Sequence, residues 1–192
     1  MEWAVVTIRN ETHRDVEARE QLLDCVWGPS RFEKTAERLR EDRSPAAGLS
    51  LIAEQDGKVV GTVRLWHVCA GPGRPALLLG PLAVDEDCRN RGIGSRLMRR
   101  AIGIAGRRGH DALLLVGDAA YYQRFGFSAA KTGALQLPGP FERPRLLGCE
   151  LKAGGLDGTR GLISATGRSV RKPPFNMLVA GLAGIQAARH AA

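Results

Sequence analysis

Four short segments between residues 77 and 127 decide the fold of this chain: LLLGPLAV at 77–84, RNRGIG at 89–94, ALLLV at 112–116 and YYQRFGF at 121–127. The first and third are apolar runs that are too short for helices, which is typical of strands covered on both faces. The second segment joins the first strand to an amphipathic helix. Strand, helix and strand in this order predict a parallel crossover.

The beginning of that helix, predicted over residues 92–107, is expected to bind an anion. The first N–H groups of a helix have no partner within the helix and lie at the positive end of its dipole. Gly92 and Gly94 carry no Cβ, so a diphosphate can approach the main chain closely. The pattern is neither a P-loop, because Ser95 follows the second glycine, nor a dinucleotide fingerprint, because Leu97 replaces the third glycine.

Length and cysteine usage indicate the number of domains and the redox compartment of the protein. A chain of 192 residues suits one domain and can bury about 70% of the surface that its unfolded form exposes. Its four cysteines lie far apart and form no C-x-x-C pair, which favours a reducing compartment and gives no reason to expect a metal. The chain has neither an export signal nor eighteen consecutive apolar residues, so we expect a cytoplasmic protein without membrane contact.

A net charge of +8 and a pI near 9.9 raise the question of nucleic-acid binding. The basic residues are spread along the chain and are not interleaved with aromatic residues, so this is the weaker inference. One polyanionic ligand explains the local excess of arginine equally well. For Arg99, Arg100 and Arg107 a solvated helix face is the better interpretation.

The N-terminal third is predicted to form a strand over residues 4–9 and two amphipathic helices over 12–26 and 31–42. In the second helix a buried stripe is expected at positions i, i+4 and i+7, which are Phe32, Ala36 and Leu39.

The middle of the chain predicts a three-stranded meander. Short β-rich runs at 49–54 and 59–68 are separated by a segment that contains Asp56-Gly57, a strong hairpin signal. A loop rich in Gly and Pro at 70–75 then leads to the strand that ends at Val84.

After the crossover, Asp118 is predicted to cap a short helix that ends at Gly126 through a left-handed glycine. A strand is expected from Phe127 onward, and the last strand is expected at 146–151.

The resulting order β-α-α-β-β-β-α-β-α-β-β, together with the spacing Arg-x-x-Gly-x-Gly after a strand, resembles the GNAT superfamily of N-acetyltransferases over residues 4–152. The resemblance implies a mixed α/β sheet of the α+β type in which the fourth and fifth strands splay apart to admit acetyl-CoA. Residues 1–152 would form the acetyltransferase domain. Residues 153–192 would be an extension, partly ordered or docked through a helix within 177–188, with disorder as the alternative.

Family members bind the pantetheine arm of CoA along the fourth strand and its diphosphate on the Arg-x-x-Gly-x-Gly amides. Carried over to this chain, the resemblance implies cofactor contacts from Leu82, Ala83, Val84, Arg89, Asn90, Arg91, Gly92, Ile93, Gly94 and Ser95. No metal is implied.

Tyr122 occupies the position where many members carry their general acid, four residues before Gly126. A phenol can donate to the thiolate that leaves when an amine attacks a thioester. The alternative is a packed aromatic ring with a satisfied hydroxyl, and Tyr121 is assigned to packing. The N–H of Ala83 is the expected donor to the carbonyl oxygen.

No general base is evident from the sequence. Glu54, His67 and Glu86 lie near strand ends, but a surface carboxylate or half-buried histidine explains each of them equally well.

Two departures from the family pattern stand out. Gly117-Asp118 replaces the asparagine that many members carry at the end of the fifth strand. The stiff segment at 138–145 resembles a loop in a bacterial subgroup of predicted N-acetyltransferases, and we expect it to border the acceptor site.

The resemblance implies an enzyme that transfers acetyl from acetyl-CoA to a primary amine of a small molecule or peptide. A non-catalytic acyl-CoA sensor that uses the same loop is the alternative. The expected partners are acetyl-CoA and the amine, with neither nucleic acid nor membrane, and a homodimer stays open.

Overall fold

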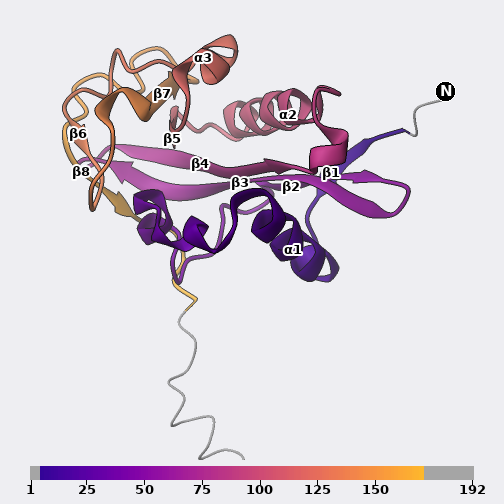
Figure 1. Ribbon diagram of the computed structural model, residues 1–192. Coiled ribbons are helices and arrows are strands. Elements are labelled where there is room, and N and C mark those ends of the chain that lie inside the picture. The colour runs from indigo at the N-terminus through magenta and orange to yellow at the C-terminus, as the bar shows by residue number, and fades with distance from the viewer. Residues whose placement is uncertain (1–4, 171–192) are drawn as a thin grey trace, which may run out of the picture.

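The computed structural model describes residues 5–170 and contains an open sheet of eight strands (Figure 1). The strands follow the order β1-β2-β3-β4-β5-β7, and β8 pairs with both β3 and the short β6. Their bounds are β1 Thr7–Asn10, β2 Ser50–Gln55, β3 Lys58–Ala70, β4 Pro75–Val84, β5 Ala112–Val116, β6 Leu135–Gln136, β7 Leu146–Glu150 and β8 Gly161–Ala165. The predicted mixed α/β architecture is therefore confirmed.

Two helices cover opposite faces of this sheet (Figure 1): α1, Val16–Trp27, on one and α2, Ile93–Arg107, on the other. On its face, α1 packs Leu22 and Leu23 against Ala83 of β4. The larger core lies under α2, whose apolar stripe is buried as its 3.6-residue period predicts. A third helix, α3, Ala119–Tyr122, follows β5.

The predicted hairpin is confirmed. β2 and β3 pair antiparallel, and the turn residues Asp56 and Gly57 have φ angles of 51° and 75°. Positive φ at both central positions matches the twist of the flanking strands, which is why Asp-Gly is favoured there.

The predicted splay between β4 and β5 is also confirmed. The two strands run parallel, but they pair only at Leu77 with Leu113 and Leu78 with Leu114. Beyond that point β4 continues to Val84, while β5 is paired on its other side by β7. The second half of β4 therefore has one edge that no strand covers within residues 5–170.

The helix predicted over 31–42 is wrong. The chain forms two 3₁₀ helices there, Pro29–Glu33 and Thr35–Leu39, because Lys34 between them has an extended backbone with φ −65° and ψ 132°. Only the end of the expected stripe is in the core: Leu39 is 3% exposed, whereas Phe32 is 58% exposed. The Cζ atom of the Arg31 guanidinium lies 4.0 Å from the centroid of the Phe32 ring.

The segments after α3 differ in part from the prediction. Asp118 accepts a hydrogen bond from the N–H of Ala120, and Gly126 has a φ of 85°, as expected for the cap and the end of the turn. No strand begins at Phe127, where Ser128 makes only an isolated bridge to Gly148.

The strand predicted to be the last, β7, is followed by β8, which pairs antiparallel with β3. The helix expected within 177–188 lies outside the described residues. Within the described part of the chain no helix is both long and apolar enough to cross a membrane.

Candidate active site

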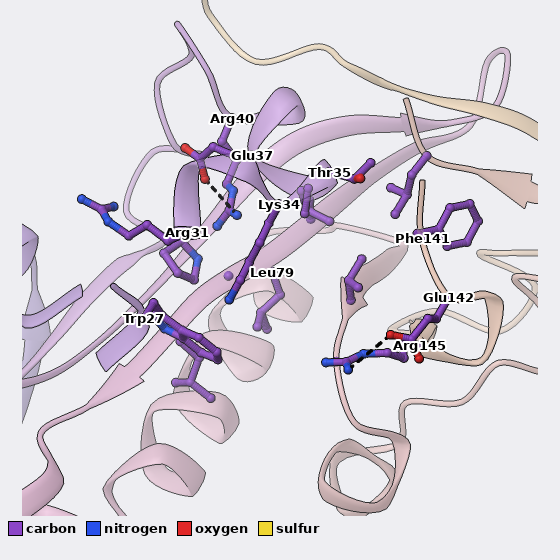
Figure 2. A pocket seen from close by; sticks show the side chains of 18 of the residues that line it. Trp27, Arg31, Lys34, Thr35, Glu37, Arg40, Leu79, Phe141, Glu142 and Arg145 are labelled. Carbon is purple, nitrogen blue, oxygen red and sulfur yellow. Dashed lines mark ion pairs between the residues drawn. The ribbon is translucent and has the colours of Figure 1, made fainter. Parts of the chain in front are cut away.

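A cavity of about 640 Å³ opens beside the uncovered edge of β4. Its walls are the segment from Trp27 to Arg40, the second half of β4, the end of β5 with the start of α3, and the loop at 137–145. Figure 2 shows Trp27 and Arg40 on one side of it and Arg145 on the other. The cavity thus lies where the strands separate.

Tyr122, the predicted general acid, lies in this cavity. Its ring meets Tyr121 edge-on at 4.9 Å and Phe127 at 6.1 Å between centroids. No side chain or main-chain group of residues 5–170 forms a hydrogen bond with its hydroxyl. Burial raises the pKa of Tyr122 to about 12, because the charged phenolate would be poorly solvated.

Gly117 explains how the Tyr122 ring fits against the end of β5. A Cβ at position 117 would lie 2.3 Å from Cε2 of Tyr122, a distance that no real pair of carbons adopts. The absence of a side chain, which the sequence showed only as a departure from the family pattern, therefore makes room for the ring.

The beginning of α2 presents open main-chain nitrogens. Gly92 precedes the helix in a left-handed conformation with φ 73°, and no side chain caps the helix. The first helical hydrogen bond runs from the N–H of Arg96 to the oxygen of Gly92 at 3.0 Å. Within the described residues the N–H groups of Ile93, Gly94 and Ser95 therefore have no partner, as an anion site requires.

In the rest of the predicted diphosphate loop, Arg89 and Asn90 are exposed and Arg91 is half-buried. Arg89 pairs with Glu86 at 2.9 Å on the surface, and Asn90 has a positive φ of 61°. The Arg91 guanidinium lies 3.5 Å from the sulfur of Cys88. Arg99, Arg100 and Arg107 are exposed on α2, as expected of a solvated face.

Tyr121 connects the cavity to this loop. It lines the cavity, and its hydroxyl oxygen lies 3.0 Å from the position that a Cβ on Gly94 would take. Its ring packs on Phe125 at 5.7 Å, in agreement with a packing role. Tyr121 therefore lies between the cavity and the first turn of α2, and none of the cavity's lining residues comes from α2 itself or from the loop at 89–92.

The hydrogen-bonding pattern of β4 changes one expectation. The N–H of Asp85 donates to the oxygen of Val60 on β3 at 2.9 Å. Because antiparallel pairs alternate, Ala83, opposite Thr62, also directs its N–H toward β3. Ala83 is thus not a free donor, whereas Leu82 and Val84 direct their N–H groups into the gap.

A cluster of basic side chains, Lys34, Arg40 and Arg145, also lines the cavity. The Arg40 side chain is only 9% exposed and pairs with Glu37 at 3.0 Å. Lys34 places its ammonium 3.8 Å from the centre of the Trp27 ring, and Arg145 pairs with Glu142 at 3.7 Å. Sequence reasoning missed this cluster, because the predicted 31–42 helix gave no reason to direct these side chains inward.

The loop at 138–145 borders the cavity, as predicted. Pro140, Phe141, Glu142 and Arg145 are among its lining residues. Arg38 donates to the oxygen of Pro138 at 2.7 Å, and the hydroxyl of Thr35 donates to that of Pro140. These bonds attach the loop to the 3₁₀ segment across the cavity.

None of the three acidic or histidine side chains considered as bases lies in the cavity. Glu54 binds Arg9 at 2.6 Å, His67 packs on His110 at 5.6 Å, and Glu86 pairs with Arg89. Residues 5–170 contain no group of three or more His, Cys, Asp or Glu side chains placed to hold a metal ion.

Comparison with known proteins yields consistent matches. The acetyltransferase (GNAT) family matches residues 16–127. The uncharacterized N-acetyltransferase YhbS of Escherichia coli K12 is 29% identical over 157 residues, which cover 81% of this chain and 93% of YhbS.

Two solved structures agree with the fold. The structure of E. coli YhbS in complex with CoA matches with a TM-score of 0.73 and 28% identity, covering 86% of this chain and 92% of that one. A GNAT family acetyltransferase from Brucella melitensis in complex with acetyl-CoA matches with a TM-score of 0.56 and 26% identity, covering 76% of this chain and 96% of that one.

Proposed function

Because the chain belongs to the acetyltransferase (GNAT) family, we propose that it transfers an acetyl group from acetyl-CoA to a primary amine of a small molecule or peptide. One observation carries this proposal. A single cavity contains the uncovered edge of β4 and Tyr122, and through Tyr121 it adjoins the uncapped start of α2. These are the parts needed to hold a thioester carrier and to act on its acyl end.

The cofactor would bind along the gap. The diphosphate would lie on the loop from Arg89 to Ser95, where three main-chain N–H groups and the helix dipole favour negative charge. The pantetheine arm would pair with residues 82–84 of β4, whose outer edge is open beyond Leu78. CoA and acetyl-CoA in the two solved relatives support this assignment.

The chemistry would proceed by direct attack. The acceptor nitrogen forms a bond to the thioester carbonyl carbon, and the tetrahedral oxyanion accepts a hydrogen bond from the N–H of Leu82. The C–S bond then breaks, the thiolate leaves, and the nitrogen loses its proton to water.

Tyr122 would act on the departing sulfur. Its raised pKa keeps the hydroxyl protonated but also makes it a weak acid. Complete proton transfer to the thiolate, whose conjugate thiol has a pKa of about 8.5, would be uphill by about 3.5 pKa units. We therefore assign Tyr122 a hydrogen bond that strengthens as negative charge develops on sulfur, and the thiolate finally takes its proton from solvent.

Replacing Tyr122 by Phe tests this assignment. The Tyr122→Phe variant keeps the ring and removes the hydroxyl, so kcat should fall by about 10²-fold or more while the Kd for acetyl-CoA stays unchanged. Turnover would be followed by CoA release with a broad amine panel, and affinity by calorimetry.

The Tyr121→Phe variant is the matched control, because it removes the neighbouring hydroxyl beside Gly94 and should leave kcat intact. Unchanged turnover in Tyr122→Phe would reject the role of the phenol. If the wild-type protein binds acetyl-CoA but acetylates no amine, the sensor alternative replaces the enzyme.

A further inference from the structure

The basic cluster has no part in the proposed CoA binding or in the proposed acyl transfer. It consists of Lys34, Arg40 and Arg145. Lys34 and Arg40 flank the 3₁₀ helix Thr35–Leu39, and Arg145 lies in the loop at 138–145 on the other side of the cavity (Figure 2). None of the cavity's lining residues comes from α2, where the diphosphate is proposed to bind. The cluster therefore faces the part of the cavity that is left for the acceptor.

Arg40 is the most constrained of the three. Its side chain is 9% exposed, and one terminal nitrogen pairs with Glu37 at 3.0 Å. Its Nε is buried and has no hydrogen-bond partner within residues 5–170. Its other terminal nitrogen lies beside Gly80 of β4, 3.9 Å from the position that a Cβ there would take. Glu37 therefore satisfies only part of this guanidinium, and an anionic group in the cavity beside Gly80 would give it a second partner.

Lys34 adds a cation that no carboxylate neutralises within the described residues. Its ammonium stays over the Trp27 ring at 3.8 Å. Its pKa is lowered by burial and by the positive charges of Arg40 and Arg145, so these three cations repel one another. An anion placed among them would relieve that repulsion.

The acidic side chains of the cavity do not fill this role. Glu37 pairs with Arg40, Glu142 pairs with Arg145 near the surface, and Asp118 caps α3. Glu33, the fourth acidic residue of the lining, is exposed and forms no ion pair with the basic cluster. Arg31, the remaining basic residue in the lining, is occupied by Glu20 and by Asp24 at 2.8 Å.

We propose that the acceptor carries an anionic group, a carboxylate or a phosphate, which binds to Lys34, Arg40 and Arg145 and thereby presents its amine to the thioester. This inference rests on the proposed acetyltransferase function and names its substrate class. Gly80 lies on β4 just before Leu82, so an anion at Arg40 lies close to the strand that would hold the acyl group. A short distance between amine and anion, as in an amino acid or an aminoalkyl phosphate, fits this arrangement.

Paired acceptors test the proposal. Glycine would be compared with glycinamide, and phosphoethanolamine with ethanolamine, each pair at equal concentrations of free amine. The anionic member should have a kcat/KM about 10- to 100-fold higher, the range expected for hydrogen bonds to a charged group. The two pairs also distinguish a carboxylate from a phosphate.

The Lys34→Gln and Arg40→Gln variants should remove most of that preference, so that the ratio of kcat/KM between the anionic and the neutral member falls toward one. Arg107→Gln, which neutralises an exposed arginine outside the cavity, is the matched control and should keep the preference. Equal losses on both members of a pair, or no preference in the wild type, would overturn the proposal while leaving the acetyltransferase function intact.

A binding measurement covers the case in which none of these amines is acetylated. Titration of the wild-type protein with inorganic phosphate or acetate should change tryptophan fluorescence in a saturable way, because Trp27 contacts Lys34. The change should be lost in Lys34→Gln, which replaces a side chain that is exposed at the cavity wall and not required by the core. No saturable change, or an unaltered one in this variant, would overturn the anion site. Saturable binding without acetylation would refute only the enzymatic function.

Discussion

At the scale of single residues, the pair Gly117 and Tyr122 determines how the phenol meets the cavity. The Gly117→Ala variant would place a Cβ 2.3 Å from Cε2 of Tyr122, so the ring must move. We expect kcat to fall by at least about tenfold and the free energy of unfolding to fall by about 1–3 kcal/mol, the usual result of overpacking.

Steady-state kinetics and urea unfolding would measure both effects. Gly133→Ala is the control, because that glycine has no neighbour within 4 Å of the added Cβ and no left-handed backbone. A Gly117→Ala enzyme with wild-type kcat would show that the ring position is not critical.

The raised pKa of Tyr122 leads to a prediction about pH. A phenol with a pKa of about 12 stays protonated through pH 10, so loss of its proton cannot reduce kcat below that pH. The pH profile of kcat should keep the same shape in Tyr122→Phe at a lower level. An alkaline fall near pH 9 that disappears in the variant would contradict this.

Several individual residues of the candidate site could be singled out from the sequence. Gly92 and Gly94 were singled out from their spacing after a strand, and Tyr122 from the family resemblance. In the structure the two glycines lie at the uncapped start of α2, and Tyr122 lines the cavity. Arg40 and Lys34 could not be identified, because their direction depends on the extended backbone at Lys34, which breaks the expected helix. The choice between Ala83 and Leu82 as donor depends on strand register, which no local pattern specifies.

At the scale of elements, the proposed binding of the cofactor depends on the uncapped start of α2. The Gly94→Ala variant would put a Cβ 3.0 Å from the Tyr121 hydroxyl, in the first turn of α2 where we propose that the diphosphate binds. We expect the Kd for acetyl-CoA to rise by at least about tenfold, since the main-chain N–H groups would be held away from the anion.

Gly106→Ala is a matched control in the same helix. Position 106 has open space around the added Cβ, so binding should not change, and stability should rise by about 0.5–1 kcal/mol because alanine is the better helix former. Calorimetry and thermal unfolding would report both values. Equal affinities in the two variants would place the cofactor elsewhere.

Local sequence patterns were enough to predict some of the helices, strands and turns but not others. The hairpin at Asp56-Gly57, the crossover through α2 and the Asp118 cap were predicted from local chemistry and are confirmed. β8 was missed because residues 161–165 are held by pairing with β3, far away in sequence, and carry little alternation of their own. A two-residue strand such as β6 has no recognisable pattern.

At the scale of the whole molecule, a buried ion pair fixes the N-terminal strand to the start of α1. The Asp15 carboxylate accepts two hydrogen bonds from Arg9 at 2.7 Å and one from the Thr12 N–H at 2.7 Å. Asp15→Asn should lower the free energy of unfolding at pH 7 by about 2 kcal/mol, less than for a fully buried pair because Arg9 is 35% exposed.

The effect should depend on pH. Hydrogen bonding to Arg9 holds the pKa of Asp15 well below its usual range, so its stabilisation is present above about pH 4 and is lost as the pH falls below it. Urea unfolding at pH 7 and pH 3 should therefore show a smaller difference between wild type and Asp15→Asn at pH 3. The same difference at both pH values would argue against the ion pair as its source.

The central claim is that main-chain nitrogens at the start of α2 hold the diphosphate of acetyl-CoA beside the open edge of β4. Calorimetric titration with acetyl-CoA and with S-acetylpantetheine, which lacks the diphosphate and nucleotide, tests it most directly. We predict saturable 1:1 binding of acetyl-CoA and at least about 10²-fold weaker binding of acetylpantetheine, since several charge-assisted hydrogen bonds are missing. No heat with acetyl-CoA, or equal affinity for the two compounds, would contradict the claim.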